Sequence, residues 1–208
     1  NSVGQLGDGT TSGRISPVYI TDAVTSGVSS SSVSFLFKNT GTLLAIGLNA
    51  NGQFGNGTEV GSVTPVQVSD AGIQSVSSGS AHTLFFHTDQ TLWGSGRNSW
   101  GQLGIGRVSD EELTPIQIDS SVTAIEAAPN RSFYVKSDGT LWGMGRDPYA
   151  DFAPAPSHTI NTPVQISSGV SSVSGGGSHT LFLKRGFPEA PEISAQPTDV
   201  NTPFGEST

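Results

Sequence analysis

The chain has 208 residues, a formal net charge of −8 and no cysteine. The negative charge argues against a nucleic-acid or anionic-membrane partner because phosphate groups would be repelled. The lack of cysteine excludes disulfides and thiolate metal sites. Glycine is abundant and only 12% of residues are charged, which favours short strands and many turns over helices. No apolar run reaches the roughly 18 residues that a membrane-spanning helix needs.

The sequence elements recur with a period of about 50 residues. A Pro-Val or Pro-Ile pair and an apolar triplet each appear four times. The pairs start at Pro17, Pro65, Pro115 and Pro163, and the triplets are 35–37, 84–86, 133–135 and 181–183. A period of this length with several strand-like segments is typical of a propeller, in which each unit buries its face against its neighbours.

The second copy shows the strands expected in each unit. They are 65–68, 73–76, 82–87 and 91–96. We therefore expect a blade of four strands that begins at the Pro-Val pair. Between its last two strands the third copy has Asp138-Gly139, which predicts a two-residue hairpin turn of type I′. Trp93 and Trp142 share one position in the last strand, where they are expected to pack the blades together.

Several longer motifs recur at matching points of the period. They are GQLG at 4–7 and 101–104, GQFG at 52–55, GSAHTLF at 79–85, GGSHTLF at 176–182 and DGTLWGMG at 138–145. These motifs resemble the regulator of chromosome condensation repeats, of a bacterial type. The resemblance covers residues 1 to about 185 and implies an all-β fold, a β-propeller with four-stranded blades and usually seven of them.

About four repeats are present, so the resemblance implies a partial arc of the ring. The chain starts in the middle of a motif, and we expect about three blades to be missing at the N-terminus. The open arc would expose two apolar sheet faces, which missing N-terminal repeats or a second chain would have to cover to close the ring.

The repeat pattern ends near residue 185. Residues 186–208 contain the Pro-rich stretch 187–191, which predicts a linker, and 192–208 has no partner to pack on and is expected to be disordered or extended. Within it, Pro191-Glu192-Ile193 followed by Gln196-Pro197 and Gly205 resembles the start of a bacterial immunoglobulin-like domain. This second resemblance implies a large, exported multidomain protein.

Two histidines, His82 and His179, occupy one repeat position, and imidazole is able to bind a metal or act as a base. The other copies carry Val33 and Arg131 there, so no ring of histidines surrounds the axis. A side chain that bonds neighbouring backbone is the favoured interpretation.

No catalytic, cofactor or metal site is expected. The acidic run 110–112 is interpreted as a solvated loop, because a calcium site needs more oxygen ligands than it offers, even with Asp8 and Asp151. The glycine clusters lack the lysine of a phosphate-binding loop, and no G-x-S-x-G elbow is present.

Trp100 is the strongest candidate for a binding residue. It lies in a loop whose residue varies between copies, and exposed loop aromatics favour binding hot spots. The residues at this position in the other copies are Val3, Asn51 and Tyr149. We predict a binding site formed by Trp100, Arg97 and Asn98; the alternative is that the ring only covers its own turn. Other arginines at strand ends or in loops are Arg107, Arg131 and Arg146.

The leading functional hypothesis is a non-enzymatic protein-protein interaction or scaffold module of an exported bacterial protein, secreted or at the cell surface. A rigid ring presents its blade-connecting loops to a protein partner. We expect neither nucleic-acid binding nor membrane insertion. The resemblance implies two alternatives, a nucleotide-exchange regulator of a small GTPase and a protein inhibitor of a secreted enzyme. An enzyme would need acidic or histidine residues that converge on the central channel, which the repeat positions do not supply.

Overall fold

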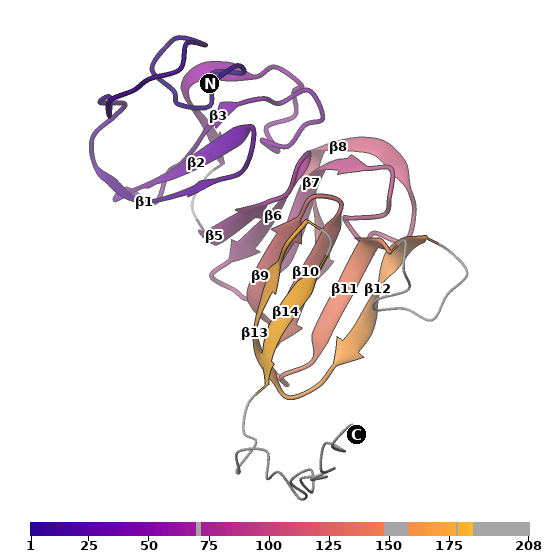
Figure 1. Cartoon of the computed structure of the whole chain (residues 1–208). Coiled ribbons are helices and arrows are strands. Elements are labelled where there is room, and N and C mark those ends of the chain that lie inside the picture. Colours follow the sequence, from indigo (N-terminus) through magenta and orange to yellow (C-terminus); the bar gives the residue numbers. More distant parts are fainter. Residues whose placement is uncertain (70–71, 148–157, 178, 185–208) are drawn as a thin grey trace, which may run out of the picture.

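The computed structural model describes residues 1–69, 72–147, 158–177 and 179–184. Within these ranges the regular elements are strands, arranged in three four-stranded antiparallel sheets and one two-stranded sheet (Figure 1). No helix in the described ranges has the length and hydropathy to cross a bilayer. The prediction of an all-β fold with four-stranded blades is confirmed. The predicted linker and immunoglobulin-like segment at 186–208, and Tyr149, lie outside the described residues.

Each four-stranded sheet is one blade, with its strands side by side in chain order. The first blade contains β1 (Val24–Ser29), β2 (Val33–Lys38), β3 (Leu43–Gly47) and β4 (Ser62–Ser69). The second contains β5 (Ile73–Ser78), β6 (His82–His87), β7 (Leu92–Asn98) and β8 (Ser109–Asp119). The third contains β9 (Val122–Ala128), β10 (Arg131–Lys136), β11 (Leu141–Arg146) and β12 (Thr159–Ser167), and the fourth sheet pairs β13 (Val170–Gly175) with β14 (Thr180–Lys184). The first strands β1, β5, β9 and β13 contact one another in succession, which makes them the inner strands of the fan.

The Pro-Val strand ends a blade and does not begin one, so the predicted start of the unit is wrong. Pro115 lies in β8, which pairs with β7 of the same blade through Gly94 and Ile116. The next blade follows after only Ser120 and Ser121. Ser121 has a φ of 59°, and this left-handed conformation turns the chain out of one sheet and into the next. The residues at this position in the other repeats are also left-handed: Ala23, Gly72 and Gly169, with φ values of 54°, 108° and 69°.

The hairpin between the second and third strands also differs from the prediction. A type I′ turn needs two central residues with positive φ, and here Gly139 has a φ of 81° while Asp138 does not adopt a positive φ. The Gly139 N–H donates to the carbonyl of Lys136 at 2.9 Å. The Asp138 carboxylate accepts bonds from the N–H and hydroxyl of Thr140 at 2.9 and 2.6 Å, which holds a three-residue loop with one left-handed position.

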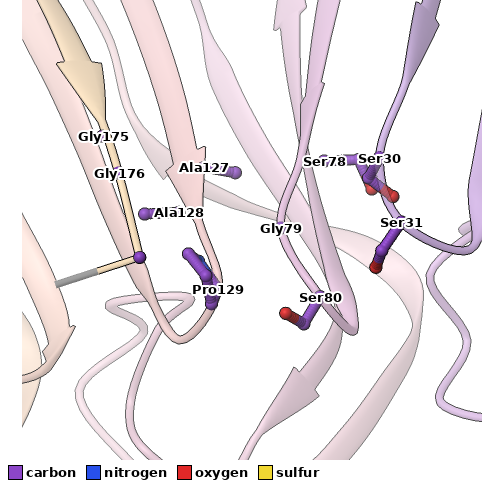
Figure 2. Close-up of a pocket in the computed structure, with 11 residues that line it drawn as sticks. Ser30, Ser31, Ser78, Gly79, Ser80, Ala127, Ala128, Pro129, Gly175 and Gly176 are labelled. Atoms are coloured by element: carbon purple, nitrogen blue, oxygen red, sulfur yellow. The ribbon is translucent and has the colours of Figure 1, made fainter.

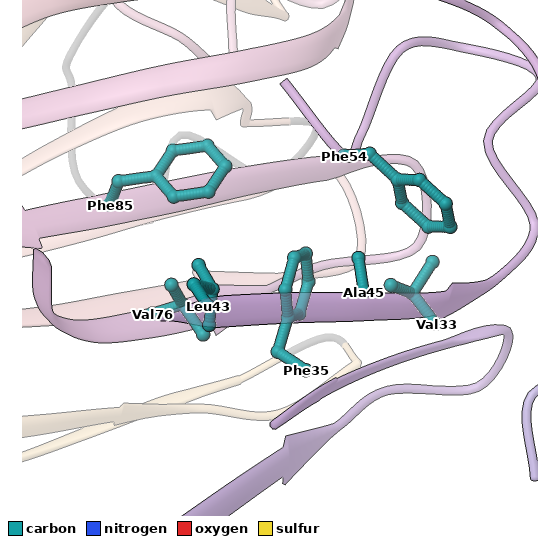
Figure 3. Packing of buried hydrophobic residues seen from close by; sticks show 7 residues of the cluster. All are labelled: Val33, Phe35, Leu43, Ala45, Phe54, Val76 and Phe85. Carbon is teal, nitrogen blue, oxygen red and sulfur yellow. The ribbon is translucent and has the colours of Figure 1, made fainter. Parts of the chain in front are cut away.

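The hydrophobic core lies between the blades. Phe35 of β2 packs edge-on against Phe85 of β6 in the next blade, with ring centroids 6.3 Å apart (Figure 3). Phe54, from the GQFG motif, joins them at 6.5 Å from Phe35 and is fully buried, as is Leu103 of the next motif. Burying each of these side chains contributes about 1.5–3 kcal/mol, so the loop motif itself belongs to the core.

Both ends of the fan expose apolar residues whose counterparts inside it are buried. Leu6, the equivalent of Leu103, is 39% exposed. On β14, Leu181 is 67% exposed, whereas the equivalent Leu84 on β6 is fully buried. Two apolar faces are therefore open, one at each end.

Candidate binding face

Two sets of connections lie at the same end of the blades, which we call the loop face. They are the inner turns 30–32, 79–81 and 129–130 and the outer loops 48–61 and 99–108. Adjacent antiparallel strands reverse direction, so the turn after each first strand and the loop after each third strand share one end. The Arg97 N–H donates to the carbonyl of Ala81 at 2.8 Å, which ties the outer part of this face to the inner part. The opposite end, with the hairpins 39–41, 88–90 and 137–139, is the hairpin face.

Asn98 fastens the outer loop of the second blade. Its Oδ1 accepts the Leu103 N–H at 3.0 Å, and its Nδ2 donates to the carbonyl of Arg107 at 2.9 Å and to Oγ of Ser109 at 3.1 Å. The side chain is fully buried. Asn98 therefore shapes the loop from inside, and its side chain is not presented on the surface as the predicted binding site required.

The glutamine of the GQLG motif joins this loop to the next blade. Gln102 accepts the Trp100 N–H with its Oε1 at 3.0 Å, and its backbone carbonyl accepts the hydroxyl of Ser132 at 2.7 Å. Gln5 and Ser34 form the same link between the first motif and the first blade, at 2.8 Å. The position of the loop face is thus fixed by bonds across the blade boundary.

Trp100 lies across that boundary. The indole is half-buried, and the guanidinium carbon of Arg146, from β11 of the third blade, lies 4.9 Å from the ring centroid. This distance is within the range of a cation–π interaction, which contributes about 0.5–1 kcal/mol at exposed sites. The ring contacts a neighbouring blade, so it does more than cover its own turn.

Arg97 and Arg146 occupy equivalent positions on consecutive blades. Each directly follows a glycine with a positive φ. Both are exposed, and within the described ranges neither forms an ion pair with a carboxylate. Arg97 Nε donates to Oγ of Ser99 at 2.7 Å. Arg107, by contrast, pairs with Glu112 at 2.7 Å. Among the described residues, the loop face therefore carries two exposed guanidinium groups without an ion pair, and that of Arg146 lies over the Trp100 ring.

A hollow of about 300 Å³ lies at the inner side of the loop face, where the turns of successive blades meet (Figure 2). One side carries Ser30, Ser31, Ser78 and Ser80, and the other carries an alanine-proline turn and three glycines. The Oγ atom of Ser30 is buried and has no hydrogen-bond partner among the described residues. This hollow could not be predicted from the sequence, because its residues are small and lie in separate repeats.

His82 is enclosed between blades, and His179 is exposed. The Nε2 atom of His82 lies 2.9 Å from Oγ of Ser132. Burial lowers the pKa of His82 to about 4, against a smaller opposing effect of the backbone at Arg131. His82 thus acts as a buried polar contact. In the described part of the chain, no three histidine or acidic side chains are grouped to hold a metal ion.

The acidic run lies on a strand and not in the predicted loop. Asp110, Glu111 and Glu112 belong to β8, because the outer strand of this blade starts at Ser109. The Oε1 atom of Glu112 accepts bonds from Arg107 at 2.7 Å and from the Ser109 hydroxyl at 2.8 Å. Its carboxylate therefore fixes the loop that it closes.

A polar network on the hairpin face was not found from the sequence. Asp119 accepts the hydroxyl of Tyr134 at 2.7 Å and the ammonium of Lys136 at 3.0 Å. Burial alone would raise the pKa of Asp119, but the bonds from Tyr134, Ser120 and Lys136 outweigh it and lower that pKa. Burial, and next the nearby Asp119 carboxylate, raise the pKa of Tyr134. The network joins the outer strand β8 to β10 of the next blade.

Known repeats and structures match this architecture. Residues 40–86 match the family model described as the Regulator of chromosome condensation (RCC1) repeat, and residues 73–102 match a second model of the same description. Both segments match the RCC1 repeat. The matches lie in the first and second blades, within the region where the sequence motifs predicted the resemblance. No curated protein matches the chain.

Several solved structures share the fold. Human WBSCR16 is 22% identical with a TM-score of 0.66, over 74% of this chain and 43% of that one. Yeast RCC1 (Prp20), in its structure with Kap60, is 18% identical with a TM-score of 0.70, and the match covers 80% of this chain and 43% of that one. Prp20p from Saccharomyces cerevisiae, described together with its binding to Gsp1p and histones, is 18% identical with a TM-score of 0.69. The match covers 80% of this chain and 45% of that one. The chain spans less than half the length of each of these proteins, and the similarity establishes the fold.

Proposed function

We propose that the chain is a non-enzymatic protein-protein interaction module that binds its partner through the loop face. The observation that carries this proposal is the Arg146 guanidinium at 4.9 Å from the Trp100 ring centroid, across two blades. Tryptophan and arginine are enriched among the residues that dominate binding energy. The surrounding loop is already held by Asn98 and Gln102, so ordering it on binding costs little entropy.

The similar structures support a protein partner. Yeast RCC1 (Prp20) is solved in complex with Kap60, and Prp20p is described with its binding to Gsp1p and histones. The resemblance also supports a second candidate, regulation of a small GTPase. The two candidates differ in one readout: a regulator would accelerate nucleotide release from a purified GTPase partner, and a simple scaffold would not. The net charge of −8 supports a partner other than nucleic acid or an anionic membrane.

We further propose that the module belongs to an exported bacterial protein, secreted or at the cell surface. The resemblance of Pro191-Glu192-Ile193 to an immunoglobulin-like strand supports this location. The open apolar faces at Leu6 and Leu181 support further repeats or a second chain that packs there. Fractionation of the native cells with an antibody against the chain tests the location, and recovery in the cytosol alone would contradict it.

Quantitative pull-down with the full-length protein tests the binding face. Trp100→Ala is compared with Trp142→Ala, which removes another half-buried indole, 5.9 Å from Lys136 at the hairpin end of β11. We expect Trp100→Ala to lower partner recovery by at least about tenfold and Trp142→Ala to leave it unchanged once folding is verified by circular dichroism. Equal recovery with wild type and Trp100→Ala would remove the proposed site.

A further inference from the structure

The hollow on the loop face is built by equivalent turns of four successive sheets. Ser30, Gly79 and Gly176 each begin a turn, and the N–H of each donates to the carbonyl three residues on, of Val33, His82 and His179, all at 2.9 Å. Since the inner strands are neighbours, these turns converge on the inner edge of the fan. The hollow is therefore a product of the repeat geometry and not of one loop.

Two of the lining glycines lie directly against the histidine ring of their own turn. A Cβ on Gly79 would lie 2.4 Å from the His82 ring and 2.5 Å from the carbonyl of Ala128. A Cβ on Gly176 would lie 2.4 Å from the His179 ring. At Gly177, by contrast, a Cβ would meet nothing within 4 Å, so this wall faces open space.

The chemistry of the wall limits what can bind. The lining residues are serine, glycine, alanine and proline, so no charged or aromatic side chain of the described residues lines the hollow. A charged group inside it would lose water without gaining a counter-charge, which is costly. Small-molecule sites are lined mainly by hydrophobic and aromatic side chains, which are missing here. Small residues instead allow the close approach of another backbone.

The serine hydroxyls have unused hydrogen-bonding capacity. Ser30 Oγ is buried without a partner among the described residues. Ser78 Oγ makes only long contacts, at 3.4 Å to the carbonyl of His82 and 3.3 Å to Oγ1 of Thr83. A group that enters the hollow with both donors and acceptors would satisfy them.

We propose that the hollow receives the tip of a loop from the protein partner, and that this tip is polar and uncharged. The inference rests on the proposed function and specifies the partner: the tip of its loop enters the hollow at the inner turns, while Trp100 and Arg97 contact the flank of the same partner. Glycine, serine, threonine and asparagine fit this description, since their turns offer backbone and hydroxyl or amide groups to Ser30 and Ser80.

A selection from a phage-displayed library of disulfide-closed peptide loops against the full-length protein tests the proposal. Gly177→Trp fills the hollow from a wall with free space, and Gly13→Trp is the matched control, since a Cβ there also meets nothing within 4 Å. We expect the enriched loops to have uncharged polar tips. They should bind wild type and Gly13→Trp equally, and Gly177→Trp at least about tenfold more weakly.

A second blocking variant, Ser80→Trp, changes an exposed residue and covers the case in which Gly177→Trp is misfolded by circular dichroism. Loops that bind both blocked variants as well as wild type would overturn the proposal. So would enriched loops with acidic tips that lose binding in Arg97→Ala, or a selection that enriches no loops. If Trp100→Ala abolishes recovery of the natural partner while Gly177→Trp does not, the hollow is not used and the proposed function stands.

Discussion

The Nε2 atom of His82 lies 2.9 Å from the Oγ atom of Ser132, so a histidine of one blade bonds a hydroxyl of the next. Ser132 gives its only proton to the carbonyl of Gln102 at 2.7 Å. The bond with His82 must then be donated by the imidazole, which assigns its proton to Nε2. One residue triplet thus connects two strands and the GQLG loop.

This contact predicts that stability falls when the pH drops below about 6.5. The pKa of His82 is lowered from 6.5 to about 4 by burial, so in this window the unfolded chain binds a proton that the folded chain does not. The free energy of unfolding is highest above the pKa that His82 has in the unfolded chain. It decreases as the pH falls below that pKa, with a total loss on the order of 3 kcal/mol. Denaturant unfolding between pH 7 and 4 measures it. His82→Gln should flatten the slope, and His87→Gln, at the other end of β6, should not; equal slopes would contradict the assignment.

Asp119 and Tyr134 should be energetically coupled. Removing one partner leaves the other, the fully buried Tyr134 or the partly buried Asp119, without its bond. Asp119→Asn and Tyr134→Phe should therefore each cost about 1–3 kcal/mol, with a coupling of about 1–2 kcal/mol in the double mutant. The pKa of Asp119 is lowered in the folded protein. Its contribution to the free energy of unfolding is therefore present above the pKa of the unfolded chain and is lost as the pH falls below about 4. That window lies below the one for His82. Asp22→Asn is the control, since Asp22 is 82% exposed in its pair with Lys38, and should change stability by less than about 0.5 kcal/mol.

Asn98→Ala should destabilise the fold although the residue lies at the very end of β7, where the outer loop begins. The change leaves the Leu103 N–H and the Arg107 carbonyl without their buried partner, which costs about 1–3 kcal/mol. Urea denaturation measures the loss, and limited proteolysis should show cleavage within 99–108. Asn39→Ala, at an exposed hairpin, is expected to be neutral. A stable Asn98→Ala that loses only partner binding would show that the side chain acts at the surface after all.

Gly96→Ala should be far more damaging than Gly41→Ala, although both glycines have positive φ, of 101° and 83°. At Gly96 a Cβ would lie 2.6 Å from the carbonyl of Ala81, whereas at Gly41 it would meet nothing within 4 Å. We expect about 1 kcal/mol of backbone strain at Gly41 and more than about 3 kcal/mol at Gly96, where strain and backbone clash combine. Thermal unfolding of the two variants compares them directly. Similar losses would mean that the strand edge shifts to admit the methyl group.

The repeat period was enough to predict the fold, because Phe35 and Leu84 fill equivalent places on β2 and β6 and every copy needs the same neighbour. It could not locate the start of a blade, because a periodic pattern has no first element. The strand that contains Pro115 fits the pattern equally well as the first or the last strand of a blade. The buried role of Asn98 does leave a signal in the sequence, because Asn1 and Asn49 stand at the same repeat position and their Oδ1 atoms accept the Leu6 and Phe54 N–H at 2.8 Å. The contact of Trp100 with Arg146 joins residues about one period apart, and only the angle between blades decides that they meet.

The connection between the second and third blades consists of only two serines, and this determines where the protein can be cut and recombined. A repeat excised at the proline would separate β7 from β8 and leave two unpaired strand edges. A repeat taken from Val122 onward carries its own complete ladder of backbone hydrogen bonds. Duplication or exchange of blades should therefore succeed at Ser120-Ser121, where the breakpoint divides no sheet.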